Sequence, residues 1–171
     1  MGPSSSFEIL TNSNWLKPLS NFDIENILKG ITNFRGVYSK DMLPKRIGED
    51  ESVVINTQDY LDGGGTHCVC VVNQPNSNDG EYFDSFGVHP SDVVVGCMKT
   101  SGKGLVYSDN HIQDVDSVMC GYYVCYFILE QAKGRPVREI LNFSKPKQMS
   151  RWLKCLLWLL QAMEQSGKTI S

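Results

Sequence analysis

The sequence predicts a single domain that combines helices with a β-hairpin. Its 171 residues, 41% of them hydrophobic, are enough for one compact domain with its own core. Two apolar runs, "THCVCVV" and "EYFDSF", flank "NQPNSNDG", a stretch crowded with turn formers, which is typical of two strands joined as a hairpin. Residues 117–131, "SVMCGYYVCYFILEQ", have the continuous apolar character of a long buried helix that begins near Cys120.

The N-terminal third predicts one helix and one strand. In "LSNFDIENILKGI", Ser20 or Asn21 is a candidate N-cap, and apolar residues follow at roughly helical spacing: Phe22, Ile24, Ile27, Leu28 and Ile31. "FRGVYSKDMLP" has the character of a loop. "ESVVINTQ" indicates a short strand before the turn expected at "DGGG".

The C-terminal third predicts two helices. The helix that begins near Cys120 should stop near Gly134, with Pro136 beyond it. A last helix, from about Lys147 to Gln165, is expected to cover the core with its apolar residues Trp152, Leu153, Leu156, Leu157, Leu159 and Leu160. The pattern assigns no element to the stretch between the hairpin and the Cys120 helix.

Charge and composition exclude several classes of function. The net charge of −3, with both signs interspersed, gives no broad electrostatic footprint for nucleic acid, although a local basic patch stays open. The longest apolar run, "WLKCLLWLL", is well short of the roughly 20 residues that span a membrane, so we expect no membrane association. Six cysteines without a signal peptide favour a reducing compartment over secretion. We expect one domain over 1–171, with residues 1–6 as a disordered tail or a cloning remnant.

The hairpin brings together a histidine and an acid. Partners in an antiparallel pair share a constant sum of residue numbers, and if Val72 and Asp79 close the connection that sum is 151. His67 then lies directly opposite Asp84, where Cβ atoms are about 4.5–5.5 Å apart. The carboxylate can orient the imidazole and stabilise the imidazolium, as in a nucleophilic triad. The alternative is an incidental surface pair at the end of a strand.

Cys120 is the candidate nucleophile because a thiol at a helix N-terminus lies at the positive end of the macrodipole, which favours the thiolate. Gln113 lies just upstream, where its amide NH2 can stabilise an oxyanion together with backbone N–H groups at the helix start. The alternatives are that Cys120 is a small buried hydrophobic residue and that Gln113 is an ordinary exposed loop residue.

Two other motifs carry little weight. In "HCVC", His67 and the pair Cys68 and Cys70 lie on opposite faces of a strand, so they cannot readily converge on one zinc ion, and we expect no metal. The glycines Gly63 to Gly65 precede a strand and lack the helix and lysine of a phosphate loop, so they indicate a turn.

Taken in order, "GGGTHCVCVV", "YFDSFG" and "IQDVDSVMCGYYVCYFI" resemble the adenovirus-type (adenain-like) cysteine proteases, and more closely the maturation proteases of virophages and related virus-like transposons. The same clan contains the SUMO-type deconjugating proteases. "FRGVYSKDMLP" and "VVINT" extend the resemblance upstream, so that it covers roughly residues 20 to 130.

The resemblance assigns roles to four residues: His67 as catalytic histidine, Asp84 as its acidic partner, Gln113 as oxyanion-hole glutamine and Cys120 as nucleophile. It implies an α+β fold in which helices flank a central mixed sheet and the nucleophile lies at a helix N-terminus. It also implies a cysteine endopeptidase that cleaves viral capsid or other structural precursors at glycine-containing sites during virion maturation. We therefore expect a monomer in the virion and the host-cell cytoplasm, with no resident cofactor. Adenain is activated by a peptide and by DNA, but no residue here carries those sites over.

The sequence departs from the family pattern at two positions. The family commonly has Trp directly after the histidine, where this sequence has Cys68, and adenain has Glu where this sequence has Asp84. The first change puts substrate specificity in question but removes no proton-transfer group. Three other functions stay open: a protease that removes a ubiquitin-like modifier, an acyltransferase with the same thioester chemistry, and a non-catalytic binding module of the same fold.

Overall fold

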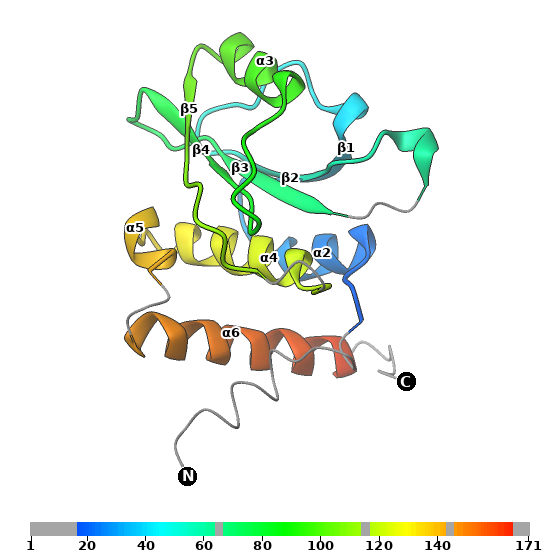
Figure 1. The fold of residues 1–171 in the computed structure, drawn as a ribbon, viewed down its shortest axis with the longest axis vertical. Coiled ribbons are helices and arrows are strands. Elements are labelled where there is room, and N and C mark those ends of the chain that lie inside the picture. Colours follow the sequence, from blue (N-terminus) through cyan, green and yellow to red (C-terminus); the bar gives the residue numbers. More distant parts are fainter. Residues whose placement is uncertain (1–16, 64–66, 114–116, 143–145, 166–171) are drawn as a thin grey trace.

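The computed structural model describes residues 17–63, 67–113, 117–142 and 146–165. Two expectations, a tail over residues 1–6 and a turn at Gly64 and Gly65, lie outside these residues. The termini of the described chain lie on the side of the molecule that carries the helices α2 (Asn21–Leu28) and α6 (Pro146–Gln165) (Figure 1).

A five-stranded mixed sheet forms the centre of the described fold (Figure 1). The strands lie side by side in sequence order. Both outer pairs, β1 with β2 and β4 with β5, are parallel, whereas the inner pairs are antiparallel. The strands are β1 (Phe34–Ser39), β2 (Ser52–Asn56), β3 (Cys68–Val72), β4 (Asp79–Phe83) and β5 (Gly104–Tyr107). The predicted α+β class with a central mixed sheet is therefore confirmed.

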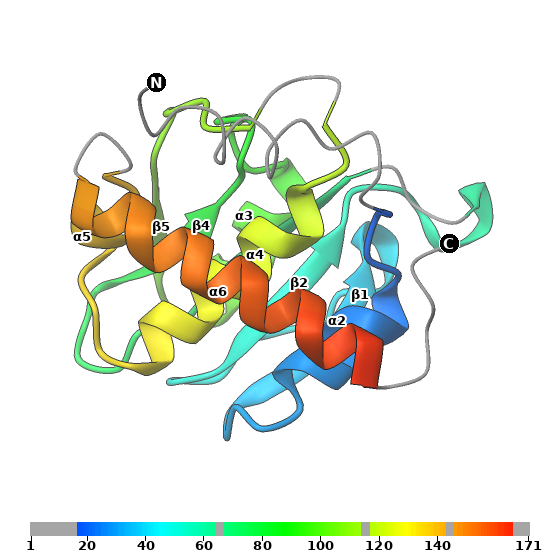
Figure 2. The ribbon, with the colours of Figure 1, turned by 90° about the horizontal axis from the view of Figure 1, so that it is seen from below.

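Helices cover both faces of this sheet. α2 and α4 (Cys120–Ala132) lie against one face. α6 lies on the side of these two helices that faces away from the sheet (Figures 1 and 2). α3 (Asp92–Thr100) lies on the opposite side, and the short α5 (Val137–Ile140) follows α4. Two 3-10 turns, η1 (Lys40–Met42) and η2 (Tyr60–Asp62), lie in the connections around β2.

Strand β3 is buried on both faces, and its alternating side chains separate two hydrophobic cores. Cys68, Cys70 and Val72 face α4 in the larger core, whereas Val69 and Val71 face α3 in the smaller one. A continuous apolar run such as "CVCVV" is typical of a strand covered on both sides. Even-numbered residues of β3 therefore face α4, and odd-numbered residues face α3.

Helix α4 lies between the sheet and α6, and almost every side chain along it is buried. The Phe127 ring stacks on Phe83 of β4 with centroids 4.6 Å apart, and the Tyr123 ring stacks on Trp152 of α6 at 4.4 Å. After Ala132 the chain turns through Gly134, whose φ of 77° is in the left-handed region. The expected long buried helix, with its end near Gly134, is confirmed.

The other expected elements are confirmed in part. Ser20 caps α2 in a reciprocal pair of hydrogen bonds with Asp23, although Phe22 is exposed. Prediction of a loop at "FRGVYSKDMLP" is wrong, since the segment forms β1 and η1. Gly36, at a φ of 121°, accompanies an irregular register in β1 and interrupts its alternating pattern. α3 and β5 were not assigned from the pattern, because both are short and interrupted by glycine or polar residues.

Adjacent leucines on α6 test whether that helix is part of the core. Leu156 is 0% exposed and Leu157 is 46% exposed. Leu156→Ala should lower the free energy of unfolding by about 2–5 kcal/mol, because it leaves a cavity beneath α4. Leu157→Ala should change it by about 0.5 kcal/mol or less. Urea unfolding measures both. Equal losses for the two variants would contradict the packing of α6 described here.

Candidate active site

The register of the β3–β4 hairpin differs from the predicted one by two residues. Cys70 pairs with Phe83 and Val72 pairs with Glu81, so the constant sum is 153 rather than 151. The prediction is wrong because Asp79 and Gly80 do not close the hairpin. They pair with β5 instead, which leaves a longer connection after Val72.

His67 and Asp84 are nevertheless hydrogen-bonded, with His67 Nε2 2.9 Å from Asp84 Oδ1. A shift of two residues keeps every side chain on its face of the sheet, so the two residues become diagonal neighbours instead of direct partners. Both residues lie just outside the paired strands, His67 before β3 and Asp84 after β4. Asp84 is only 3% exposed, which excludes the alternative of an incidental surface pair.

Phe86 holds this pair in place, a role that the sequence did not reveal. Its backbone N–H donates to Asp84 Oδ1 at 2.7 Å, and its ring stacks on the His67 imidazole with centroids 4.6 Å apart. Gly87 closes the turn by donating its N–H to the Asp84 carbonyl at 3.0 Å. At its φ of 69° a Cβ atom would lie 2.5 Å from the Asp109 carbonyl oxygen, so only glycine fits. The correct register would have revealed Phe86, because the sum of 153 places it opposite His67.

Cys120 is the first residue of α4 and is partly exposed, while Met119 before it is buried. Its Sγ lies 3.5 Å from Sγ of Cys68. Since Nε2 of His67 binds Asp84, Nδ1 is the nitrogen left for proton exchange with the thiol. Nδ1 is buried and has no hydrogen-bond partner among the described residues. A buried ring nitrogen without a partner is poised to accept a proton.

Gln113 is buried, at 2% exposure, which overturns its interpretation as an exposed loop residue. The Ser85 hydroxyl donates to Gln113 Oε1, and Gln113 Nε2 donates to the Ser117 carbonyl at 2.8 Å. Two backbone bonds to the Ser85 carbonyl, from Ile112 and Gln113 at 3.0 Å each, attach this segment to the residue after Asp84. The second N–H of the Gln113 amide is left for another acceptor, and Ser117, which accepts the first, lies three residues before the start of α4.

The N-terminal segment packs against the first turn of α4. A Cβ atom on Gly121 would lie 2.9 Å from Cβ of Leu19, which is too close. The residue directly after Cys120 is therefore a glycine because a larger residue would clash with Leu19. The Tyr122 hydroxyl donates to the Lys17 carbonyl at 3.0 Å in the same region. These two contacts hold the first turn of α4 in place.

Hydrogen bonds and charge shift the pKa values of both reacting groups. Donation from Cys68 lowers the pKa of Cys120 most; burial opposes this, and the neighbouring His67 imidazole lowers the pKa further, to about 4. Burial alone would lower the pKa of His67, but Asp84 and Cys120 raise it to about 9. The site therefore holds a thiolate and an imidazolium over most of the neutral pH range.

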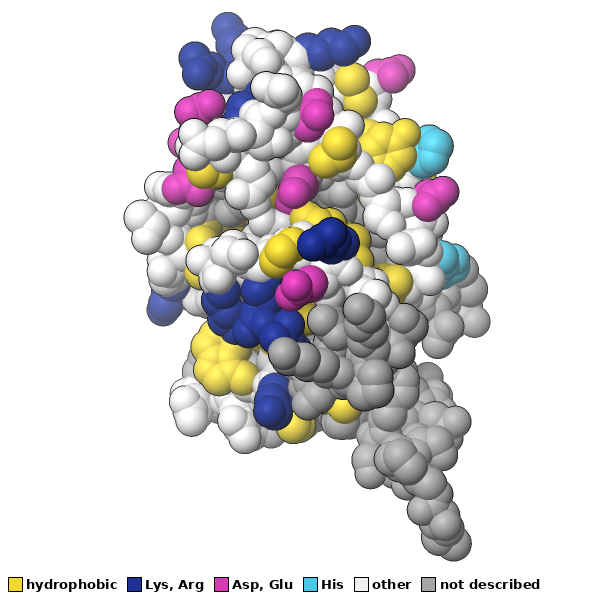
Figure 3. Space-filling model, turned by 90° about the vertical axis from the view of Figure 1, so that its left-hand side faces the viewer, with side chains coloured by type: hydrophobic (Ala, Val, Ile, Leu, Met, Phe, Trp, Pro, Cys, Tyr) yellow, Lys and Arg dark blue, Asp and Glu magenta, His cyan; other side chains and the backbone are white. Residues whose placement is uncertain are grey.

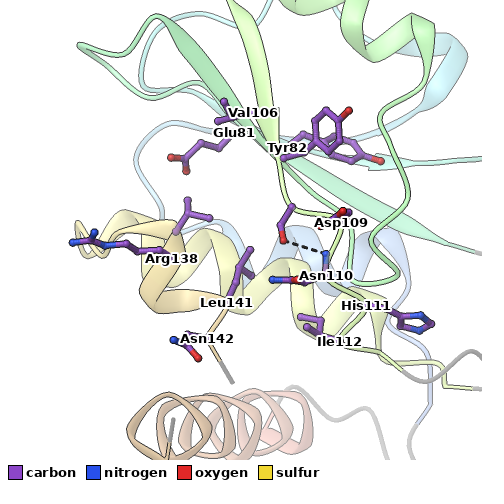
Figure 4. Close-up of a pocket in the computed structure, with 13 residues that line it drawn as sticks. Glu81, Tyr82, Val106, Asp109, Asn110, His111, Ile112, Arg138, Leu141 and Asn142 are labelled. Carbon is purple, nitrogen blue, oxygen red and sulfur yellow. Dashed lines mark hydrogen bonds between the residues drawn. The ribbon is translucent and has the colours of Figure 1, made fainter. Parts of the chain in front are cut away.

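A large cavity in the described structure lies away from this site. It has a volume of about 900 Å³ and lies between the β4–β5 edge and α5, with Glu81, Tyr82, Val106 and Arg138 in its walls (Figure 4). A smaller cavity of about 320 Å³ is lined by His67 and Asp84 themselves. The chemistry places the site at His67, because a thiol, an imidazole and a carboxylate converge there.

Among the described residues, no cluster of three or more His, Cys, Asp or Glu side chains is placed to hold a metal ion. No helix in the described parts of the chain is both long and apolar enough to cross a membrane. On the face drawn in Figure 3, acidic side chains lie among the basic ones. All six cysteines are free thiols.

A thiolate, an imidazole and a carboxylate that meet beside a mixed sheet define a site for nucleophilic chemistry on an α+β fold. No protein-family model matches the sequence, and no curated protein matches it significantly. Among solved structures, Se-Met ASFV pS273R protease superposes with a TM-score of 0.52 at 16% identity, over 91% of this chain and 70% of that one. The SUMO protease Ulp1, with its catalytic cysteine oxidized to a sulfinic acid, gives a TM-score of 0.47 at 19% identity, over 92% and 83%. The chain thus has the fold of pS273R protease, which agrees with the predicted α+β class.

Selective labelling tests the electrostatics of the site. At pH 6 an ordinary thiol is ionised to roughly 0.3%, and burial or neighbouring groups raise the pKa of the other five cysteines further. Iodoacetamide at pH 6 should therefore label Cys120 first, at a rate that changes little between pH 5 and 8 because its pKa is about 4. Peptide mass spectrometry locates the label. Labelling of Cys120 that falls tenfold per pH unit below pH 8 would contradict the thiolate.

Proposed function

We propose that this chain is a cysteine endopeptidase, in which Cys120 is the nucleophile, His67 the general base and acid, Asp84 the orienting carboxylate and Gln113 an oxyanion donor. The observation that carries the proposal is the His67–Asp84 hydrogen bond of 2.9 Å beside a thiol at the start of α4. The fold shared with pS273R protease supports it. A binding module has no need of a charge-stabilised thiol beside a histidine and a carboxylate.

The proposed reaction uses each group at a stated atom. The Cys120 proton is held by Nδ1 of His67 before substrate binds, and the thiolate sulfur attacks the carbonyl carbon of the scissile peptide. The oxyanion that develops accepts hydrogen bonds from the free N–H of Gln113 and from backbone N–H groups at the start of α4. The imidazolium returns its proton to the departing amine, which leaves a thioester on Cys120.

Hydrolysis of the thioester reverses these roles. His67, now neutral, takes a proton from water, and the hydroxide oxygen attacks the thioester carbonyl. The tetrahedral species collapses, the carboxylic acid product leaves, and Cys120 departs as a thiolate with the proton on His67. Asp84 stabilises the imidazolium in both halves of the reaction, because its carboxylate stays bound to Nε2.

We further propose viral capsid or other structural precursors as the substrates, cleaved at glycine-containing sites during virion maturation. The ordered motifs around His67, Asp84 and Cys120 support this, since they resemble those of maturation proteases. By the same resemblance, the enzyme acts as a monomer in the virion and host-cell cytoplasm without a resident cofactor. Activation by DNA is tested by adding DNA to the cleavage assay, and activation by a peptide needs an assay of its own.

Variants of the site residues test the reaction. Wild type should cleave at least one precursor from a panel with Gly-Gly or Gly-X-Gly sites, with one ubiquitin-like conjugate included and with or without added DNA. Cys120→Ala should abolish cleavage, and Gln113→Ala should lower kcat by about 10²–10³-fold through loss of an oxyanion donor. Gln161→Ala, an exposed glutamine on α6, is the matched control and should leave kcat unchanged. Cleavage of the conjugate alone would favour a deconjugating protease, and no cleavage by a folded protein with unreactive Cys120 would favour the binding module.

Substrate variants test glycine selectivity. Replacing the glycine nearest the cleaved bond with alanine should lower kcat/KM, because we expect a substrate cleft narrow enough to exclude a methyl group. The measurement compares the two peptides under identical conditions. Replacing a residue five positions away on the same peptide serves as the control. If both alanine peptides are cleaved as fast as the parent, glycine selectivity is wrong while the protease assignment stands.

A further inference from the structure

Cys68, at the start of strand β3, contacts the sulfur of Cys120, at the start of helix α4. It is the first residue of β3, its side chain faces α4, and it is only 7% exposed. Its Sγ lies 3.5 Å from Sγ of Cys120, within the range of a hydrogen bond between two sulfur atoms. His67 precedes Cys68, so one short segment presents two different side chains to the same thiol.

The direction of this hydrogen bond follows from the surroundings of the two thiols. Cys68 is buried in the larger core, close to Cys70 of β3 and Cys125 of α4, and this burial disfavours a negative charge on it. Cys120 is partly exposed and lies near His67, whose other ring nitrogen is hydrogen-bonded to Asp84. Cys68 therefore keeps its proton and Cys120 gives its proton to His67. The S–H of Cys68 is then the donor and the Cys120 thiolate is the acceptor.

We propose that Cys68 is a further positioning residue of the site, which donates a hydrogen bond from its thiol to the nucleophilic sulfur of Cys120 and holds it in place as a thiolate. This inference deepens the proposed function, on which its catalytic meaning rests. The resembling family commonly has Trp at this position, so the sulfur pair is a feature of this chain.

A donor of this kind has two opposite effects on reactivity. It stabilises the thiolate, which extends the reactive form to lower pH. It also withdraws electron density from the sulfur, and the intrinsic nucleophilicity of a thiolate falls with its pKa, with a Brønsted coefficient of about 0.4–0.5. Removal of the donor should therefore slow alkylation of Cys120 at low pH and speed it at high pH. An unfolded site would produce the same crossing, so Cys68→Ser and Cys70→Ala serve to distinguish loss of the donor from loss of the fold.

The test measures the rate of iodoacetamide alkylation at Cys120 between pH 4 and pH 10 by peptide mass spectrometry. Cys68→Ala and Cys68→Val both remove the donor, and the second keeps a similar volume if the first fails to fold. Both should slow alkylation at pH 4 severalfold and raise the plateau above pH 9 severalfold. Cys68→Ser should restore most of the wild-type profile, because its O–H still donates.

Cys70→Ala is the matched control, since Cys70 lies two residues further along the same face of β3 and is also buried. It should leave the Cys120 profile unchanged. Wild-type profiles in both donor-free variants, or an equal shift in Cys70→Ala, would overturn the proposal. Alkylation requires no substrate, so its outcome is independent of the protease assay. Crossed profiles without cleavage would support the hydrogen bond between Cys68 and Cys120 and contradict the protease proposal. Cleavage without crossed profiles would support the protease proposal and contradict the hydrogen bond.

Discussion

The packing of α4 against β3 is the constraint on which the site depends. β3 is buried on both faces, so α4 and α3 must each supply an apolar layer, and α4 supplies the larger one. Because Cys120 begins α4 and Cys68 begins β3, the contact between these elements also sets the distance between Cys120 and the segment that carries His67. Core packing and the placement of reactive groups are here the same interaction.

The acidic side of the site depends on hydrogen bonds rather than on the sheet. Asp84 and Phe86 lie beyond the end of β4, where no ladder fixes their backbone. A tight turn closed by Gly87 replaces the ladder, and the Ser85 carbonyl attaches Gln113 to it through two backbone bonds. The carboxylate and the amide are thereby positioned by adjacent residues of one turn. This arrangement makes the two groups a single unit that faces the start of α4.

Much of this organisation could be predicted from the sequence, and the failures have physical causes. The long buried helix and the hairpin follow from apolar runs, because side chains covered on all sides leave a strong local signal. The register failed because the partner of Asp79 is β5, a short strand distant in sequence whose contacts no local pattern reveals. The His67–Asp84 contact survived the error only because the shift was even. Phe86 was missed because of the wrong register, and Ser85 because its role arises from a turn whose geometry depends on Asp109 across space.

The connection between β3 and β4 lies at the end of the hairpin away from His67. Five residues of β3, at about 3.3 Å each, separate the two ends. Residues 75–78 of this connection are exposed, whereas Asn73 and Gln74 before them are held by hydrogen bonds to Ile47 and Gln131. Foreign sequence inserted among residues 75–78 would extend into solvent. The pairing of β3 with β4, whose first pair beyond the connection is Val72 with Glu81, would stay intact. This tip is therefore a site where an affinity tag or a fluorescent reporter can be carried within the chain while both termini stay as they are.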